Sequence, residues 1–293
     1  MTNVRKRRWG DRKDGRLLRT LAPFYRQIPF IMKATHDCQN AFDEKFEISE
    51  AESMIRRLRN KGYKNIGILH VFLAAYVRVM AEYPALNRFI AGQRVFARNQ
   101  IEVSMVVKKQ LSINSGETSI KVVFEPTDTI REVYEKINTE VEKIKTSTEP
   151  NKTEQTANTL MKIPRLPLKF IMWMLTVLDY FGKMPMSLIN VSPFHSSLVI
   201  SDLGSVGISK IFHHLYDFGN LPVLIAFGKK YRVFEIDKDG KLNERRYIDY
   251  GAVCDERICD GYYYAISFRH LNHYLHHPEI LERPPKTVNS DID

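Results

Sequence analysis

Cysteine is scarce in this chain, whose 293 residues include only Cys38, Cys254 and Cys259. Their number is odd, and no two of them form a C-x-x-C pair. A disulfide framework or a zinc knuckle requires paired cysteines, so the sequence predicts neither. This usage is typical of a reducing compartment, and we expect a cytoplasmic protein.

Long apolar segments are also missing. No apolar stretch follows the charges of the N-terminus, so we expect no secretion signal. The most apolar run covers only residues 170–178, whereas a helix that spans a membrane needs about 20 apolar residues. We interpret this run as part of a buried or subunit-contacting helix over 168–181. Contact with a membrane surface is the minor alternative.

Motifs that bind nucleotides or metals are absent as well. Neither a G-x-G-x-x-G motif nor a P-loop occurs, so a nucleotide would be bound by individual side chains. His270, His273, His276 and His277 have helical spacing, but no carboxylate or cysteine accompanies them at a matching spacing. A solvated polar face explains them better than a metal site does, and we expect no bound metal.

Positive charge is plentiful, with a formal net charge of +10. Residues 1–19 form a basic N-terminal arm with eight Lys or Arg against two Asp. Such an arm could contact nucleic acid or an acidic membrane, but a solvated tail is the simpler interpretation. The rest of the chain is not basic enough to predict a nucleic-acid groove, so we expect no nucleic-acid partner.

Helices and strands are mixed along the sequence. Residues 66–83 are apolar on nearly all sides and predict a buried helix, and Thr129 with Glu132 forms a capping box that opens another. The predicted helices cover residues 49–62, 66–83, 129–144, 168–181 and 262–277. Alternating or β-branched stretches predict strands: one or two within 23–48, then 94–111, 118–126, 196–201, 222–228, 231–237 and 245–254.

Two segments have weaker patterns: residues 146–158 are polar and predict a linker, and residues 210–219 fit a helix or a loop. Because no regular βαβ alternation appears, the order of elements favours an α+β fold with a mixed sheet flanked by helices.

Several segments, in this order, resemble the superfamily of chloramphenicol acetyltransferase and the catalytic domain of the 2-oxoacid dehydrogenase dihydrolipoyl acyltransferases. The similar segments are IPFIMKATHDCQNAFDE, AEYPALNRFIAGQRVFARNQIEVSMVV, the helix after EPTDTI, LVISDLGSVG, PVLIAFGKK and DERICDG. The resemblance covers residues 20–293 as a single catalytic domain, and residues 146–190, a linker with the apolar helix, look like an insertion. No part of the chain resembles a lipoyl domain or a peripheral subunit-binding domain.

This resemblance implies a two-layer α/β sandwich that forms a homotrimer with active sites between subunits. Coenzyme A would enter each channel from one side and a small-molecule acyl acceptor from the other. The chain would then act as a stand-alone acyltransferase, with acyl-CoA as a substrate and no lipoyl group of its own.

The resemblance also implies roles for three residues. Acyl transfer from a thioester needs a base for the attacking thiol or hydroxyl and a donor to the oxyanion. Ser201 occupies the position of the family's oxyanion-stabilising serine. Asp260 and Gly261 match the end of the H-x-x-x-D-G motif, where the aspartate caps a helix and orients its neighbours.

Glu256 stands where the family has its catalytic histidine. A carboxylate is a weaker base than imidazole, and its charge opposes the build-up of an oxyanion or thiolate. An ion pair with Arg257 could turn Glu256 into a purely structural group. His36, His213 and His214 are the other candidates for the base, although each is more commonly a structural or surface histidine.

Lys229, followed by Lys230, matches a lysine near the CoA phosphates in chloramphenicol acetyltransferase, and two exposed lysines at the end of a strand are the plain alternative. Two functions therefore remain open. One is a CoA-dependent acyltransferase that acts on a thiol or hydroxyl acceptor. The other is a pseudoenzyme, a trimeric acyl-CoA-binding or scaffold protein.

Overall fold

A computed structural model describes residues 6–108, 117–146 and 151–293. The strands are β1 (Gly15–Leu17), β2 (Gln39–Glu47), β3 (Arg88–Ala91), β4 (Arg94–Arg98), β5 (Ile101–Lys108), β6 (Glu117–Phe124), β7 (Leu198–Asp202), β8 (Val223–Ile236) and β9 (Leu242–Asp255). The helices are α1 (Pro23–Ile31), α2 (Ser49–Asn60), α3 (Ile68–Glu82), α4 (Ile130–Thr146), α5 (Lys152–Met161), α6 (Arg165–Tyr180), α7 (Met186–Val191) and α8 (Gly261–His276), and short 3-10 turns lie at Thr35–Asp37, Pro84–Asn87, Gly204–Val206 and Pro278–Glu282.

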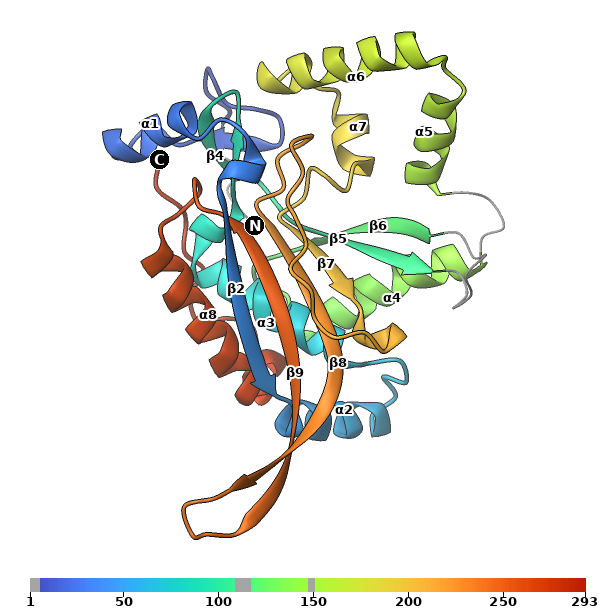
Figure 1. The fold of residues 1–293 in the computed structure, drawn as a ribbon, viewed down its shortest axis with the longest axis vertical. Helices are drawn as coiled ribbons and strands as arrows, with labels where there is room; N and C mark the ends of the chain where they lie inside the picture. The colour runs from blue at the N-terminus through green and yellow to red at the C-terminus, as the bar shows by residue number, and fades with distance from the viewer. Residues whose placement is uncertain (1–5, 109–116, 147–150) are drawn as a thin grey trace.

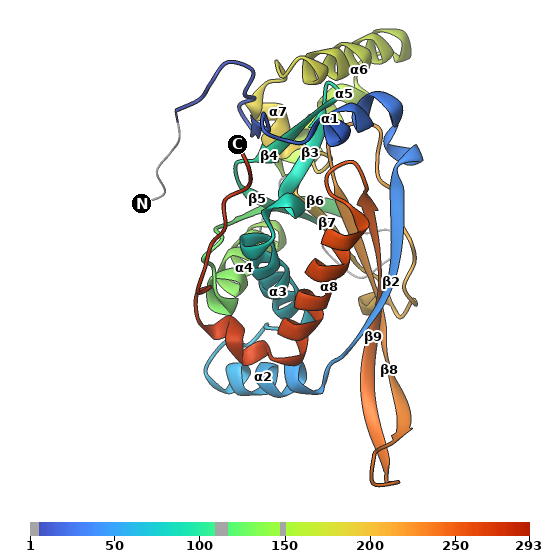
Figure 2. The same cartoon turned by 90° about the vertical axis from the view of Figure 1, so that its left-hand side faces the viewer.

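The main sheet is mixed, in the strand order β2-β9-β8-β7-β5-β6 (Figure 1). Strand β7 runs parallel to both of its neighbours, β5 and β8, while the remaining pairs are antiparallel. Helices α3, α4 and α8 lie along one side of this sheet (Figure 2). The predicted α+β class, a mixed sheet flanked by helices, is confirmed.

The core lies between this sheet and its helices. Phe46 of β2, Phe72 of α3 and Tyr250 of β9 are almost fully buried and pack their rings together. Helix α3 is buried on nearly every side, as its uninterrupted apolar composition predicts. The five predicted helices all form, as α2, α3, α4, α6 and α8.

The segment 203–219 crosses the other face of the sheet at very close range. A Cβ on Gly251 of β9 would lie 2.4 Å from the carbonyl oxygen of Ile211, and one on Gly228 would lie 2.4 Å from the backbone nitrogen of Lys210. Only glycine permits this approach. The expected helix or loop at 210–219 is a loop without helical structure.

Strands β8 and β9 extend as a hairpin beyond the body of the protein (Figures 1 and 2). Two strands were expected, over 222–228 and 231–237, but the chain forms the single strand β8 with a register shift between Phe227 and Lys230. Such an irregularity bends a strand without ending it.

Two local predictions differ from the structure. Of the one or two strands expected within 23–48, one forms, as β2 from Gln39, and it leads into α2, but residues 23–31 form helix α1 instead of a strand. Pro23 suits the first helical turn. Tyr25 packs against the small hydrophobic cluster that contains Leu18, and no local sequence pattern reveals this contact. The polar linker expected over 146–158 contains helix α5, which a capping box between Asn151 and Glu154 opens.

The N-terminal segment is not a solvated tail over its whole length. Strand β1 pairs with β4, and Arg12 is buried between Asp14, at 2.8 Å, and Asp179 at the end of α6, at 2.6 Å. Residues 1–5, 109–111 and 147–150, which the predicted arm, strand and linker include, lie outside the described residues.

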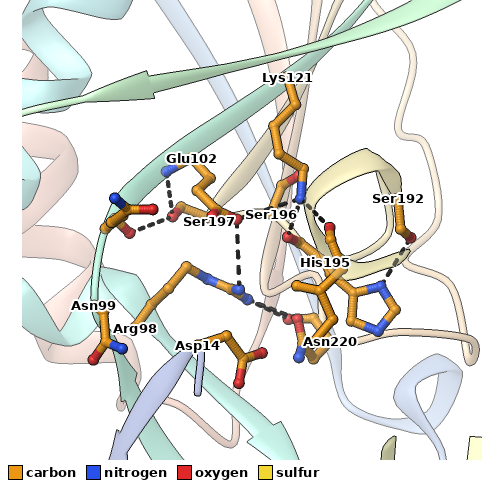
Figure 3. Close-up of polar contacts among 12 residues, drawn as sticks. Asp14, Arg98, Asn99, Glu102, Lys121, Ser192, His195, Ser196, Ser197 and Asn220 are labelled. Atoms are coloured by element: carbon orange, nitrogen blue, oxygen red, sulfur yellow. Dashed lines mark hydrogen bonds and ion pairs between the residues drawn. The ribbon is translucent and has the colours of Figure 1, made fainter. Parts of the chain in front are cut away.

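A buried polar cluster fastens the loop before β7 to the sheet (Figure 3). The ammonium group of Lys121 donates to the carbonyl oxygens of Ile189 and His195, each at 2.7 Å, and Arg98 donates to Asn220 at 2.7 Å. Burial lowers the pKa of Lys121 to about 8. The cations Arg12, Arg98 and Lys121 face the anions Asp14, Glu102 and Asp179, so the cluster is balanced in charge.

His70 in α3 gives the fold a testable dependence on pH. Burial lowers the pKa of His70 to about 4, from an ordinary value of 6.5, and its Nδ1 accepts a hydrogen bond from the backbone of Gly67 at 3.1 Å. Below pH 6.5 the unfolded chain protonates this ring while the folded chain does not. Stability therefore falls as the pH drops from 6.5 towards 4, by an amount on the order of 3 kcal/mol.

The exchange His70→Asn keeps an acceptor for Gly67 but removes the titration. We expect the loss of unfolding free energy between pH 7 and pH 4.5 to shrink by about 3 kcal/mol, as measured by urea unfolding at each pH. The same exchange at exposed His273 is the control and should leave the pH dependence as in the parent protein. An unchanged pH dependence in His70→Asn would contradict the neutral, buried state of this ring.

Candidate active site

Ser201 lies near the end of β7, where the strand leads into the turn that begins with Asp202. It is half-buried, and across the described residues its hydroxyl makes no hydrogen bond. The strand pairs in parallel with β8 and places Ser201 opposite Ala226. A hydroxyl in this position is available to donate to a ligand.

Glu256 follows the end of β9 and is also half-buried. Its backbone donates to the carbonyl oxygen of Cys38 at 2.9 Å, which continues the β2–β9 pairing into the turn. Its Oε2 accepts a hydrogen bond from Nδ2 of Asn40 at 3.0 Å. No cation pairs with this carboxylate within 4 Å in the described part of the chain.

Arg257 does not pair with Glu256, so the structural ion pair considered above does not form. Arg257 instead forms an ion pair with Asp255: its Nη2 donates to Oδ2 at 2.7 Å and its Nε donates to Oδ1 at 2.9 Å. Both side chains are at most 5% exposed. Burial alone would lower the pKa of Arg257, but hydrogen bonds to Asp255 and its charge outweigh burial and raise it.

The same guanidinium also holds the segment that precedes β2. It donates to the carbonyl oxygen of Met32 and to the hydroxyl of Thr35, each at 3.2 Å. The buried pair of Asp255 and Arg257 thus fixes the turn, while Glu256 between them points away from the pair and towards Asn40.

Asp260 caps helix α8, as predicted. Its Oδ1 accepts the backbone N–H of Tyr263 at 2.7 Å, and its Oδ2 accepts the hydroxyl of Tyr25 from α1 at 3.1 Å. The residue therefore starts one helix and positions another. A role for it in catalysis stays a prediction.

His36 is at the same end of the sheet as Glu256, two residues before Cys38. Its Nδ1 lies 3.0 Å from Oδ2 of Asp217, and its Nε2 lies 3.3 Å from Oδ1 of Asp37. The hydrogen bond to Asp217, with the charges of both aspartates, raises the pKa of His36. His36 is therefore an exposed histidine whose two ring nitrogens each face a carboxylate.

His213 and His214 lie on the loop that crosses the sheet. Their rings stack on each other at 4.7 Å, and Nδ1 of His213 accepts the backbone N–H of His214 at 2.9 Å. Neither forms a hydrogen bond or an ion pair with Ser201 or Glu256 in the described structure. Their role as substitute bases stays a prediction.

The two lysines behave differently. Lys229 is exposed and its side chain has no partner among the described residues, while its backbone donates to Ile208 at 2.8 Å. Lys230 pairs with Glu52 of α2 at 3.2 Å. Of these two lysines, Lys229 is the one without an acidic partner among the described residues, and a role in binding CoA stays a prediction for both.

Ser201 and Glu256 lie far apart in one chain. Ser201 is level with Ala226 of β8 and Gly251 of β9, and Glu256 is five positions beyond Gly251 (251 to 256). With strand geometry, these positions differ by about 16 Å along the sheet and by about 10 Å across it. One chain therefore does not bring the two side chains together.

The cysteines nearby are unsuited to act as nucleophiles. Burial raises the pKa of Cys38 to about 11 and raises that of Cys259 further. Both remain thiols at neutral pH, and the thiolate is the reactive form.

Sequence reasoning missed two residues of this region. Asn40 reaches Glu256 only because β2 pairs with β9, and Asp217 reaches His36 across 181 positions of sequence. Neither contact leaves a local signal. By contrast, the hydrogen bond from the backbone N–H of Arg257 to Asp255, at 3.0 Å, does leave a local signal in the sequence. An aspartate commonly accepts from the backbone of the residue two positions further on.

Taken together, the mixed six-stranded sheet and the helical layer along one side of it (Figure 2) define the fold. Comparisons with solved structures identify the proteins that share it. A probable dihydrolipoamide acetyltransferase from Listeria monocytogenes is 12% identical, with a TM-score of 0.54, over 86% of this chain and 88% of that one. A chloramphenicol acetyltransferase is 10% identical, with a TM-score of 0.54, over 89% of this chain and 99% of that one.

A truncated catalytic core of the 2-oxoacid dehydrogenase multienzyme complex from Thermoplasma acidophilum is similar too, with 12% identity and a TM-score of 0.51, over 88% of this chain and 97% of that one. Neither the comparison with protein-family models nor that with curated proteins gives a match. The chain thus has the fold of the dihydrolipoyl acyltransferase and chloramphenicol acetyltransferase superfamily, as the sequence segments predicted.

Proposed function

We propose that this protein transfers an acyl group between coenzyme A and a thiol or hydroxyl acceptor. The acceptor attacks the thioester carbonyl and its proton passes to a base. The oxyanion that forms collapses, and the CoA sulfur leaves and takes up a proton. Ser201 would donate to the oxyanion, and Glu256 occupies the position of the base.

The observation that carries this proposal is the unpaired hydroxyl of Ser201. The fold places a half-buried serine hydroxyl at the end of β7, and that hydroxyl has no partner across the described residues. A buried or half-buried hydroxyl normally finds a hydrogen-bond partner. An oxyanion of the substrate would supply one.

The distance between Ser201 and Glu256 supports assembly into a homotrimer with sites between subunits. Since one chain keeps these residues at different levels of the sheet, a site that uses both must draw them from two chains. Closed rotational symmetry gives every subunit the same contact, so three chains would form three sites.

Coenzyme A fits the side chains available near Ser201. Lys229 lies within the β8 irregularity, is exposed, and has no acidic partner in the described structure. Its charge would neutralise a phosphate of the nucleotide. Lys230 is engaged with Glu52 and would contribute less.

The pseudoenzyme alternative rests on Glu256. Its carboxylate accepts from Asn40 and has no cation beside it in the described chain, and a carboxylate in the position of the base opposes the build-up of negative charge on a thiolate or an oxyanion. If Glu256 cannot act as a base, the protein would bind acyl-CoA without turnover.

The two functions are separated by exchanging Glu256. We expect wild type to release thiol from acetyl-CoA or longer acyl-CoAs slowly, and Glu256→His to be faster by about tenfold or more, since a positioned imidazole contributes that much and more. Glu256→Gln should be slower than wild type if the carboxylate is the base. The measurement is thiol release with small thiol and alcohol acceptors.

Several results would count against parts of this scheme. Background rates in wild type and in Glu256→His would reject the enzyme and leave the acyl-CoA-binding protein, which equilibrium binding of acyl-CoA would then test. Equal rates in wild type and Glu256→Gln would show that Glu256 is not the base. His36 and His214 would then be exchanged next.

A further inference from the structure

One end of the protein combines exposed aromatic and basic side chains. This basic aromatic end comprises residues 161–183 around α6, Trp9, and the arginines Arg19, Arg26 and Arg94. Figures 1 and 2 both show α6 at the end opposite the β8–β9 hairpin.

Helix α6 buries little of its surface. Of its residues only Leu175 and Asp179 are buried. Leu166, Phe170 and Trp173 recur every three or four positions and are exposed, Phe170 by 61% and Trp173 by 60%, and Met174 beside Trp173 is exposed too. A helix that presents such a row to water normally packs it against something.

The exposed charges around this row all have one sign. Lys162, Arg165, Lys169 and Lys183 are exposed. The one acid between them, Asp179, is buried against Arg12. Aromatic and aliphatic side chains flanked by lysine and arginine are typical of helices that lie in a membrane interface.

The N-terminal segment continues this surface. Trp9 is 93% exposed, and its carbonyl oxygen accepts a hydrogen bond from Arg19 at 2.8 Å. Tyr180 at the end of α6 donates to Gln93 at 3.0 Å. Both tryptophans of the chain therefore lie exposed at the same end.

A cavity of about 520 Å³ lies beside this surface, between residues 17–30 and the turn from β3 to β4. Arg19, Arg26 and Arg94 line it together with apolar side chains that include Leu18 and Phe30, and no carboxylate is among the lining residues. Arg19 pairs with Asp11. The guanidinium groups of Arg26 and Arg94 have no partner among the described residues, and guanidinium binds phosphate oxygens in a bidentate manner.

We propose that the basic aromatic end docks on a membrane surface rich in anionic phospholipid. Helix α6 lies in the plane of the interface with Phe170 and Trp173 at the level of the headgroups, and the arginine-lined cavity holds a lipid phosphate. Among the described residues no helix is long and apolar enough to cross a membrane, which fits a helix that lies on the surface. A second copy of this end is a poorer partner, because it would bring like charges together.

The two tryptophans make docking directly measurable. Vesicles of equal parts phosphatidylglycerol and phosphatidylcholine should shift the tryptophan emission of the whole protein to shorter wavelength, and the protein should sediment with them. Vesicles of phosphatidylcholine alone should bind far less, and added salt should weaken binding. The variants Trp9→Phe and Trp173→Phe assign the shift to each tryptophan.

Two pairs of exchanges locate the surface. Phe170→Ser with Trp173→Ser should lower vesicle affinity about tenfold or more, and Arg26→Glu with Arg94→Glu should remove the preference for phosphatidylglycerol. The matched controls lie at the β8–β9 hairpin and alter equally exposed side chains: Phe234→Ser with Ile236→Ser, and Lys238→Glu with Lys241→Glu. They should change neither the vesicle affinity nor the preference for phosphatidylglycerol.

Sedimentation velocity of the same variants decides between a membrane and a second copy. Failure of wild type to bind phosphatidylglycerol vesicles at low salt would overturn the proposal. So would equal loss of binding in the hairpin variants. A change of oligomeric state in Phe170→Ser/Trp173→Ser without vesicle binding by wild type would instead make this end an interface between copies. None of these outcomes depends on acyl transfer.

Discussion

Exchange of Ser201 for alanine is expected to lower the turnover number for acyl transfer about 100-fold or more, because loss of one donor to an oxyanion typically costs that much. KM for acyl-CoA should change little, since the hydroxyl serves the charge that develops in the transition state. Thiol release measured over a range of acyl-CoA concentrations separates the two constants.

Ser205→Ala is the matched control for this exchange. Ser205 lies in the turn after β7 and bonds the backbone oxygen of Asp202 at 2.8 Å, so its loss removes a hydroxyl from the same region without touching the proposed oxyanion site. We expect the control to retain most of the activity. Equal losses in both variants would point to a damaged turn, and an unchanged rate in Ser201→Ala would remove this residue from the mechanism.

Mixing of two inactive variants tests the arrangement between subunits. If each site takes Ser201 from one chain and Glu256 from the next, trimers mixed from Ser201→Ala and Glu256→Gln chains regain sites with both residues intact. Random mixing of equal amounts restores about a quarter of the sites. The measurement is thiol release after joint refolding, or after exchange of subunits. Absence of any recovery in verified mixed trimers would show that one chain supplies both residues.

The elements that the sequence predicts well are those whose signal is local. Helix α3 is apolar on nearly all sides and is buried accordingly. The start of α4 is marked by a capping box, in which the backbone N–H of Thr129 donates to the carboxylate of Glu132 at 2.7 Å. Helix α5 had an equally local signal in Asn151 and Glu154. The polar composition of residues 146–158 predicts a linker, whereas this capping pattern predicts the start of a helix, and the helix is what forms.

The parts that the sequence does not predict depend on contacts between distant segments. Helix α1 contains Pro29 near its end, which argues against a helix locally, yet Tyr25 ties it to Asp260. The partner of Glu256 likewise follows from the register of β2 on β9, which sets Asn40 opposite Cys254. The sequence could therefore suggest which residues matter in the turn, but not which of them touch.

Loss of the Arg257 guanidinium is expected to cost about 3–5 kcal/mol of unfolding free energy, because Arg257→Met leaves Asp255 buried without its counter-charge. The midpoint of urea unfolding should fall accordingly, with an unchanged dependence on urea concentration. Arg232→Met is the control: Arg232 pairs with Glu244 at 3.4 Å at a side-chain exposure of 70%, and such surface pairs contribute only about 0–1 kcal/mol.

A double exchange shows whether the buried charge itself is the cause. Asp255→Asn together with Arg257→Met removes both charges. The double variant should therefore lose less unfolding free energy than the two single variants lose in sum, by about 2 kcal/mol or more. Additive losses would mean that Arg257 stabilises mainly through its bonds to Met32 and Thr35. In either case Arg257→Met releases the segment that carries His36 and Asn40. The rate of acyl transfer should therefore fall along with stability, because Asn40, which donates to Glu256, is no longer fixed in place.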